Sequence, residues 1–425
     1  MRSIISRLHR ERGQVIVMFV GIFTIIAVVG LVVVDFGLWF SERRAAQTDA
    51  DLSALAAAHE LLSCTSLSDS QASTVQQAAN DRAWEYAQLN DVTDPANVHL
   101  PDPSDSSLWT GCWEDEGDTS DTIDSFPLDV EHPTRVLFGS FFGLLAPEGL
   151  GAHARACVGS IVSVEGAMPV GIPINNPDFD RWSRELCWSP DDNDPDNLPE
   201  PLYGKRCDLS VMDKVSGEAS WLDLDNPPLP NPPSDVCSEK GGGANELGEE
   251  IAQGGANTIC HTADDDFDAA DCTDVMNWCV RSKTGAQPNK VMNAFNTLFQ
   301  SEGDCDANGD GIDEFGTSIE LDSGMPETDS AFYRVKCDSP RIVTLIIVDT
   351  FDPTGQSLMP IRAFASFFVE ACTNDKTGQV VEYPKCDPKG QIGQFNLVGR
   401  FINIVGEGPT GTPTDWSPKR IVLDE

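Results

Sequence analysis

The sequence predicts an α+β protein in which a single N-terminal transmembrane helix extends into a long helix and is followed by a disulfide-stapled mixed ectodomain. Three observations favour this fold class. An apolar run without a charged residue extends from Val15 to Val34, and all 13 cysteines lie beyond it. In the remainder, β-branched and aromatic runs follow stretches with helical spacing.

The apolar run is long enough to cross a membrane. At 1.5 Å of rise per residue, a helix from Val15 to Val34 is roughly 30 Å long, about the thickness of the hydrocarbon core of a bilayer. A secretory signal peptide is the alternative, but its apolar core is usually about 7 to 15 residues long and ends in small residues at a cleavage site. Here an acid and three aromatic residues follow, namely Asp35, Phe36, Trp39 and Phe40. We therefore expect a retained anchor.

The charges beside the span predict its orientation. Four arginines precede it, namely Arg2, Arg7, Arg10 and Arg12. Arg43 and Arg44 follow it, but they lie among acidic residues. Because arginine-rich short flanks stay on the cytoplasmic side, we expect a cytoplasmic start over 1–14, a transmembrane helix over 15–40, and the C-terminus outside a cell membrane that is crossed once.

The part beyond the span is strongly acidic. The formal net charge is −40 although the first residues are basic. Nucleic acid and anionic lipid are repelled by such a surface, which argues against either as the main partner.

The cysteines predict disulfides rather than a metal centre. Disulfides persist in the oxidising environment outside the cell membrane. Because 13 is an odd number, at least one thiol is free or pairs with another chain, which leaves an intermolecular disulfide or a homo-oligomer open. A zinc site at Cys260, His261, Cys272 and Cys279 would lack the close cysteine pairs of structural zinc sites.

Two helices are predicted in the first part of the chain. The Ala-rich stretch after the span keeps helical spacing, so one helix over 14–62 is the economical interpretation, and it would protrude some 30 Å beyond the membrane. A second helix is predicted over 70–89, where no proline interrupts the pattern. The two helices can pair as a hairpin through 63–69.

The remaining chain divides by composition. We expect a helical and strand region over 41–165, with apolar patterns at 128–145 and 152–164. A Pro- and Asp-rich linking region over 166–233 ends in the stiff segment NPPLPNPP, and a C-terminal α+β ectodomain covers 234–425. In that ectodomain, helices are predicted at 246–253 and 289–300, and strands at 342–348, 363–369 and 395–405.

The N-terminal segment resembles a known family. Its marks are Arg-Gly-Gln before the span, Asp35 and Gly37 at its exit, an aromatic pair, Arg43 and Arg44, and the run Gln-Thr-Asp-Ala-Asp before Leu-Ser-Ala-Leu-Ala-Ala-Ala. This combination, over Arg12 to Ala58, is similar to the N-terminal segment of the Tad (tight adherence, Flp) pilus-assembly proteins, the TadE/TadG-like group.

The resemblance implies a membrane-anchored accessory or minor pilin-like component that acts by assembly, with Tad/Flp pilus or secretion-machinery subunits as partners. A helix-packing seam in the membrane is expected at Ile22, Ile26, Val29 and Val33, with lipid contact as the alternative. The alternative function is a calcium-assisted surface binding module or adhesin that uses the same type of anchor.

Two departures from related patterns matter. Prepilin peptidase substrates are cut after a glycine with a glutamate five residues on, whereas Met18 stands five residues after Gly13. We therefore expect an uncleaved N-terminus. Some larger family members carry a metal site built on Asp-x-Ser-x-Ser, and Asp102, Ser104 and Ser106 match those letters. Prolines surround them and no apolar strand precedes them, which disfavours this site.

The sharpest ligand motif is the sequence DCDANGDGIDE. Its hard oxygen donors on a tight turn suit calcium, and the candidate ligands are Asp304, Asp306, Asn308, Asp310, Asp313 and Glu314. The motif departs from an EF-hand because Thr317 stands where a bidentate glutamate is expected. A solvated Asx-rich turn is the alternative.

Enzyme signatures are missing from the sequence. It contains no Gly-x-Ser-x-Gly elbow, no His-Glu-x-x-His helix and no Walker loop. We therefore expect no catalytic residues and no required cofactor, with calcium as the one candidate ligand.

Overall fold

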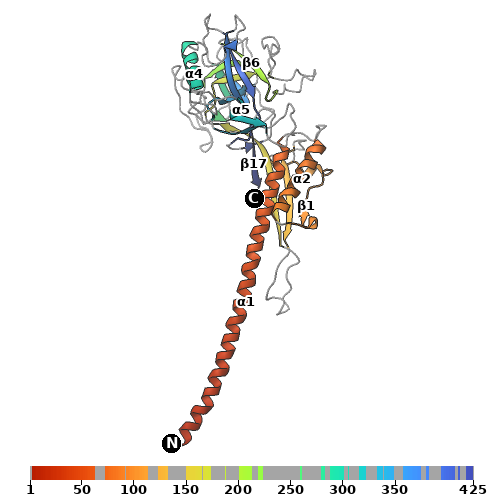
Figure 1. The fold of residues 1–425 in the computed structure, drawn as a ribbon, viewed down its shortest axis with the longest axis vertical. Helices are drawn as coiled ribbons and strands as arrows, with labels where there is room; N and C mark the ends of the chain where they lie inside the picture. Colours follow the sequence, from red (N-terminus) through yellow and green to blue (C-terminus); the bar gives the residue numbers. More distant parts are fainter. Residues whose placement is uncertain are drawn as a thin grey trace.

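The computed structural model describes the helices, most strands and several connections. The described residues are 2–62, 72–90, 92–112, 123–132, 150–164, 166–173, 187, 201–212, 219–223, 259–260, 279–282, 288–300, 305, 315–321, 333–337, 339–348, 358–374, 380–381, 394–406, 410–411 and 418–424. These residues form a long N-terminal helix with two sheet-containing units at its far end (Figure 1).

The predicted helical hairpin is present. Helix α1 (Arg2–Leu61) is one continuous helix that begins earlier than the predicted residue 14, and α2 (Ala72–Leu89) packs against its C-terminal part. Small side chains dominate the buried positions of both helices, and the fully buried alanines are Ala46, Ala50, Ala54, Ala57, Ala58, Ala79, Ala83 and Ala87. Spacings of three and four place these alanines on one face of each helix, so the two backbones approach closely.

The first sheet packs against this hairpin. Its strands are β1 (Val98–His99), β2 (Ser125–His132), β3 (Leu150–Ile161), β16 (Thr410–Gly411) and β17 (Lys419–Asp424), and all pairs are antiparallel. Two 3₁₀ helices, η1 (Pro95–Asn97) and η2 (Ser106–Leu108), connect α2 to β2. Alternate residues of β2 and β3 face the helices and are buried, including Phe126, Leu128 and Ala156. We call this unit, made of α1, α2 and the first sheet, the base module.

The second sheet forms the head of the molecule. Its strands run in the order β12 (Ile342–Val348), β5 (Val170–Pro173), β7 (Ala219–Asp223), β6 (Arg206–Met212), β15 (Gln394–Phe401), β13 (Leu358–Asn374) and β14 (Val380–Val381), with β9 (Cys279–Ser282) beside β13 and β7. β12 and β13 also pair directly. Helix α4 (Pro288–Gln300) packs on it through Phe295 and Phe299. The structure thus has strands at 342–348, 363–369 and 395–401, where the sequence predicts them, and a helix over the predicted 289–300.

Short elements complete the described chain. They are α5 (Phe315–Ser318), the hairpin of β10 (Ile319–Leu321) with β11 (Tyr333–Val335), and the pair of β4 (Ser163–Val164) with β8 (Ile259–Cys260). The helix predicted at 246–253 lies outside the described residues.

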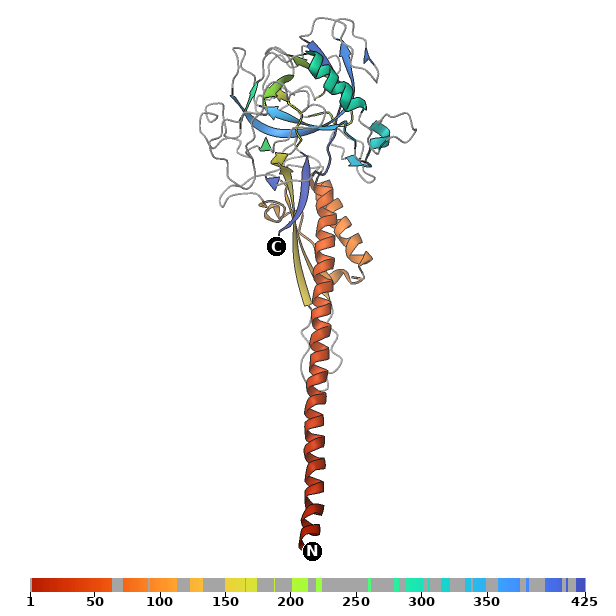
Figure 2. The same ribbon diagram turned by 90° about the vertical axis from the view of Figure 1, so that its left-hand side faces the viewer.

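Two features of the topology have no sign in the sequence. Strands β5, β6 and β7 come from the Pro- and Asp-rich range 166–233 and lie inside the head sheet. Strand β17, from the very end of the described chain, pairs with β3 of the base module. Figure 2 shows β17 beside α1, apart from the strands of the head that precede it in sequence.

Disulfides staple both units, as the sequence predicts. Cys112–Cys157 lies in the base module, Cys187–Cys207 joins the segment before β6 to that strand, and Cys305–Cys337 joins the chain before α5 to the end of β11. The mixed α+β fold with a long N-terminal apolar helix is therefore confirmed.

Candidate functional site at the helix–sheet junction

The N-terminal part of α1 exposes a large apolar surface. Phe19 is 69% exposed, Ile26 63% and Phe40 67%. Among the described residues, α1 is the one helix long and apolar enough to cross a membrane. Soluble monomers rarely expose apolar patches of this size, so this surface is suited to contact with lipid or with another helix.

The predicted packing seam lies within this surface. Ile22, Ile26, Val29 and Val33 are each more than half exposed, and a Cβ atom built on Gly21 or Gly30 would meet no atom within 4 Å. The seam is thus open to either lipid or a neighbouring helix.

The exit from the apolar stretch carries the predicted aromatic residues. The rings of Phe36 and Trp39 lie edge to face with centroids 5.3 Å apart. Rings of this kind are favoured at the headgroup level of a membrane. Asp35, one turn before Trp39, is only 7% exposed and is engaged in an interaction.

Beyond this exit, polar side chains fix α1 to the sheet. Nε2 of His132, at the end of β2, lies 2.7 Å from Oδ2 of Asp49 on α1. Gln47 donates from Nε2 both to Oδ1 of Asp51 at 2.7 Å and to the carbonyl oxygen of His153 on β3 at 3.0 Å. Because these contacts begin about two turns of α1 beyond Phe40, the orientation of the base module is fixed relative to the axis of the helix.

The far end of α1 is held by the last strand. Lys419, at the start of β17, is 3% exposed and donates from Nζ to the carbonyl oxygen of Leu62 at 3.1 Å. The last carbonyl groups of a helix lack intrahelical donors and carry partial negative charge, so a lysine is stabilising there.

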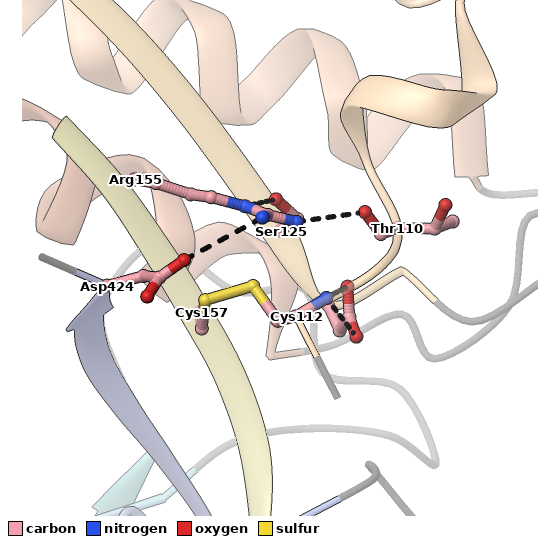
Figure 3. Close-up of a disulfide and its surroundings, with 7 residues drawn as sticks. Thr110, Cys112, Ser125, Arg155, Cys157 and Asp424 are labelled. Atoms are coloured by element: carbon pink, nitrogen blue, oxygen red, sulfur yellow. Dashed lines mark hydrogen bonds and ion pairs between the residues drawn. A yellow bond between two sulfur atoms is a disulfide. The ribbon is translucent and has the colours of Figure 1, made fainter. Parts of the chain in front are cut away.

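Arg155 gathers four segments around the disulfide of the base module (Figure 3). Its Nε donates to Oγ of Ser125 at 2.7 Å, its Nη2 donates to the carbonyl oxygen of Thr110 at 3.1 Å, and its Nη1 lies 3.7 Å from Oδ2 of Asp424. Cys112–Cys157 closes the same region covalently. Arg155 therefore links the loop after α2, β2, β3 and β17.

An open pocket lies between α1, β3 and the end of β17. Its volume is about 330 Å³, and its polar lining residues are Gln47, Asp51, His153, Arg155 and Asp424. His153 points a ring nitrogen, Nδ1, at Oδ1 of Asp129, 2.9 Å away. No group of three or more metal-binding side chains occurs in the part of the chain that the structure describes.

The predicted calcium ligands are not tested by the structure. Asp304, Asp306, Asn308, Asp310, Asp313 and Glu314 all lie outside the described residues. Cys305, inside the same motif, is described and is bonded to Cys337.

The Asp-x-Ser-x-Ser letters form a local turn. Asp102 accepts hydrogen bonds at Oδ1 from the backbone N–H and the hydroxyl of Ser104, both at 2.8 Å. These two bonds hold the pKa of Asp102 below its ordinary value, and the bond from the backbone N–H is the larger cause. Ser106 begins η2. The carboxylate oxygen of Asp102 that would bind a metal thus accepts hydrogen bonds within its own loop.

Comparison with known proteins identifies the N-terminal segment. Residues 13–60 match the Tad family, described as "Putative Flp pilus-assembly TadE/G-like". This match spans the apolar stretch of α1 and the alanine face that packs on α2, and it confirms the resemblance predicted from the sequence. None of the curated proteins and none of the solved structures compared with the chain matches it. The N-terminal segment of the chain is therefore similar to that of TadE/G-like proteins.

Proposed function

We propose that this chain is a membrane-anchored, non-enzymatic component of Flp/Tad pilus assembly, of the TadE/TadG-like type, with its N-terminus in the cytoplasm and its head outside the cell membrane. The observation that carries the proposal is the continuity of α1. The residues that match the family run without a break from an exposed apolar surface into the buried alanine face of the base module.

A helix that is exposed and apolar around its whole circumference needs lipid or other helices around it. The same helix is fixed to the sheet by Asp49, Gln47 and Lys419. A subunit built in this way holds its head at a set distance from the membrane, which is a structural role and requires no reaction.

Mechanical shearing tests the proposal. Cells that carry the full chain with a C-terminal tag are sheared, and the filament fraction and the membrane pellet are blotted for the tag. If the tag travels with filaments only when the pilus motor genes are intact, the chain is a minor subunit of the fibre.

If the tagged protein stays in the membrane pellet, cross-linking distinguishes the remaining functions. Cross-links to pilus subunits in the pellet would indicate an anchored assembly factor. Retention without any such cross-link would contradict the proposal and favour an independent adhesin. Protease added to spheroplasts tests the orientation, since a head outside the membrane is digested and a head in the cytoplasm is protected.

A further inference from the structure

Strand β3 is covered by β17 along only part of its edge. β17 pairs with β3 from Lys419, opposite Ser160, to Asp424, opposite Arg155. β3 itself continues to Leu150, and β2 follows it to that residue on the other edge. Among the described residues, no strand therefore lies beside 150–154 on the side of β17.

The backbone groups of every second residue in this stretch face the open side. Val158 donates its N–H to the carbonyl of Asp124 on the side of β2, whereas Ile161 donates its N–H to the carbonyl of Pro418, just before β17. Backbone groups alternate in direction along a strand. Gly151 and His153 are each an even number of residues from Ile161, so their N–H and C=O groups point away from β2, as those of Ile161 do. The carbonyl of His153 accepts from the side chain of Gln47, where a strand would otherwise donate.

The open edge forms one wall of the pocket described above. The opposite wall is α1, with Gln47 and Asp51, and the end of β17 closes the pocket with Asp424. Two of the charged side chains that line the pocket are carboxylates. Arg155, the one arginine or lysine in the lining, is shared among Asp424, Ser125 and Thr110. The pocket therefore suits a positively charged group.

We propose that this edge, 150–154 of β3, is a docking site for an extended segment of another protein chain. The segment runs antiparallel to β3, as β17 does, and brings a basic side chain to Asp51 and Asp424. Three observations support this occupant: the edge backbone groups of Gly151 and the N–H of His153, which pair with no described strand, the continuity with the β17–β3 ladder, and the carboxylates of the pocket. A second copy is a poor source of a basic segment because this chain has a net charge of −40.

The inference deepens the proposed function, since the segment is taken to come from a subunit anchored beside this chain. The site lies only two to three turns of α1 beyond the aromatic exit at Phe40, so a neighbouring chain that leaves the same membrane can reach it.

Site-directed photo-cross-linking in cells tests the site. A photoreactive amino acid replaces His153 in the full chain, and the adducts are mapped by mass spectrometry. Two variants are compared in this background. Gly151→Pro removes an edge N–H, whereas Gly151→Ala is the matched control because a Cβ at Gly151 would meet no atom within 4 Å. We expect the adduct to fall roughly fivefold in the proline variant, about the effect of one lost hydrogen bond, and to persist in the alanine variant.

A second variant makes the result independent of the proline. Asp51→Asn keeps the shape of the side chain and removes its charge, so it should lower the same adduct. Formation of Cys112–Cys157, read from mobility on non-reducing gels, shows that each variant has folded.

The outcomes are distinct. An adduct to a basic segment of another subunit that is lost in Gly151→Pro and retained in Gly151→Ala supports the site. An adduct within this chain, an adduct to a second copy, or equal adducts in the two glycine variants overturns it. If the sheared fractions still place the protein with the pilus machinery, the proposed function survives such a failure.

Discussion

Lys419 places a buried positive charge at the C-terminal end of α1. Its ammonium group donates to the carbonyl of Leu62, which lies 357 positions earlier in the chain. A buried lysine is stable only when its charge is compensated, and here the end of the helix supplies partial negative charge. The contact joins the first helix to the last strand.

Replacing this lysine should weaken the base module. We expect Lys419→Met to lower the free energy of unfolding by about 1.5–3 kcal/mol, because a hydrogen bond from a charged group is lost and the carbonyl of Leu62 is left buried. Urea unfolding of the full chain in detergent, followed by tryptophan fluorescence, measures the change. Arg420→Met is the control, since Arg420 is exposed. Equal effects of the two substitutions would contradict this role.

The calcium motif stays a prediction at the residue scale. If Asp304, Asp306, Asn308 and Asp310 bind calcium, a chelator should lower the melting temperature of the protein, because a ligand that binds the folded state stabilises it. Differential scanning calorimetry with and without chelator measures this, and Asp306→Asn combined with Asp310→Asn should remove the difference. An unchanged melting temperature on chelation would argue for a solvated turn.

For single residues, the sequence predicts which types of bond form but not which residues are joined by them. The position of the cysteines beyond an apolar span predicted disulfides, since compartment alone decides that. Spacing could not predict that Cys112 pairs with Cys157, because Cys112 lies outside the strands and is held near β3 by hydrogen bonds from its N–H to the carboxylate of Asp124. Lys419 and Arg155 have no local pattern that marks them, since their partners come from distant segments.

At the scale of elements, the alanine contact between α1 and α2 sets the geometry of the base module. The two helices come close because fully buried positions such as Ala57 and Ala83 have no side chain beyond Cβ. Such an interface has little room to adapt, since protein interiors are close-packed.

A larger side chain in this contact should therefore be costly. We expect Ala83→Leu to lower the free energy of unfolding by about 1–3 kcal/mol through overpacking. Gln88→Leu, on the exposed side of α2, adds a similar side chain outside the contact and should change stability little. Chemical denaturation of both variants measures the difference, and similar values for the two would show that the contact is loosely packed.

Elements with strong periodicity were predictable, and those without it were not. The helices α1, α2 and α4 follow apolar or alanine spacing of three and four, and β12 is a continuous β-branched run. β5, β6 and β7 are short strands between Pro- and Asp-rich stretches, where turn residues obscure any strand pattern. Their place inside the head sheet comes from pairing with distant strands.

At the scale of the whole molecule, the head is an insertion into the base module. β3 ends at Ile161, the chain then builds the head, and it returns through β16 and then from Pro418 onward to pair with the same strand. The two points of connection are adjacent, since Ile161 donates to the carbonyl of Pro418 at 2.9 Å. The base module is thus built from segments near both ends of the described chain, and the order of elements along the sequence does not reveal this.

This arrangement predicts that the head can be removed. Replacing 162–417 by Asn-Gly removes the head together with the two-residue strand β16 of the base module. The change should join β3 to β17 in a two-residue hairpin, because that turn matches strands whose ends are paired. We expect the shortened chain to form Cys112–Cys157 and to unfold cooperatively in circular dichroism. Scrambled disulfides or a non-cooperative transition would show that the base module depends on the head.

The position of β17 also has a consequence for the order of events during synthesis. The strand that completes the base module is synthesised after every strand of the head sheet. Until β17 is synthesised, the end of α1 lacks its contact with Lys419, and one edge of β3 lacks its paired strand. A chain cut short before β17 therefore keeps a base module that lacks this strand, and its β3 retains an edge with which another chain can pair.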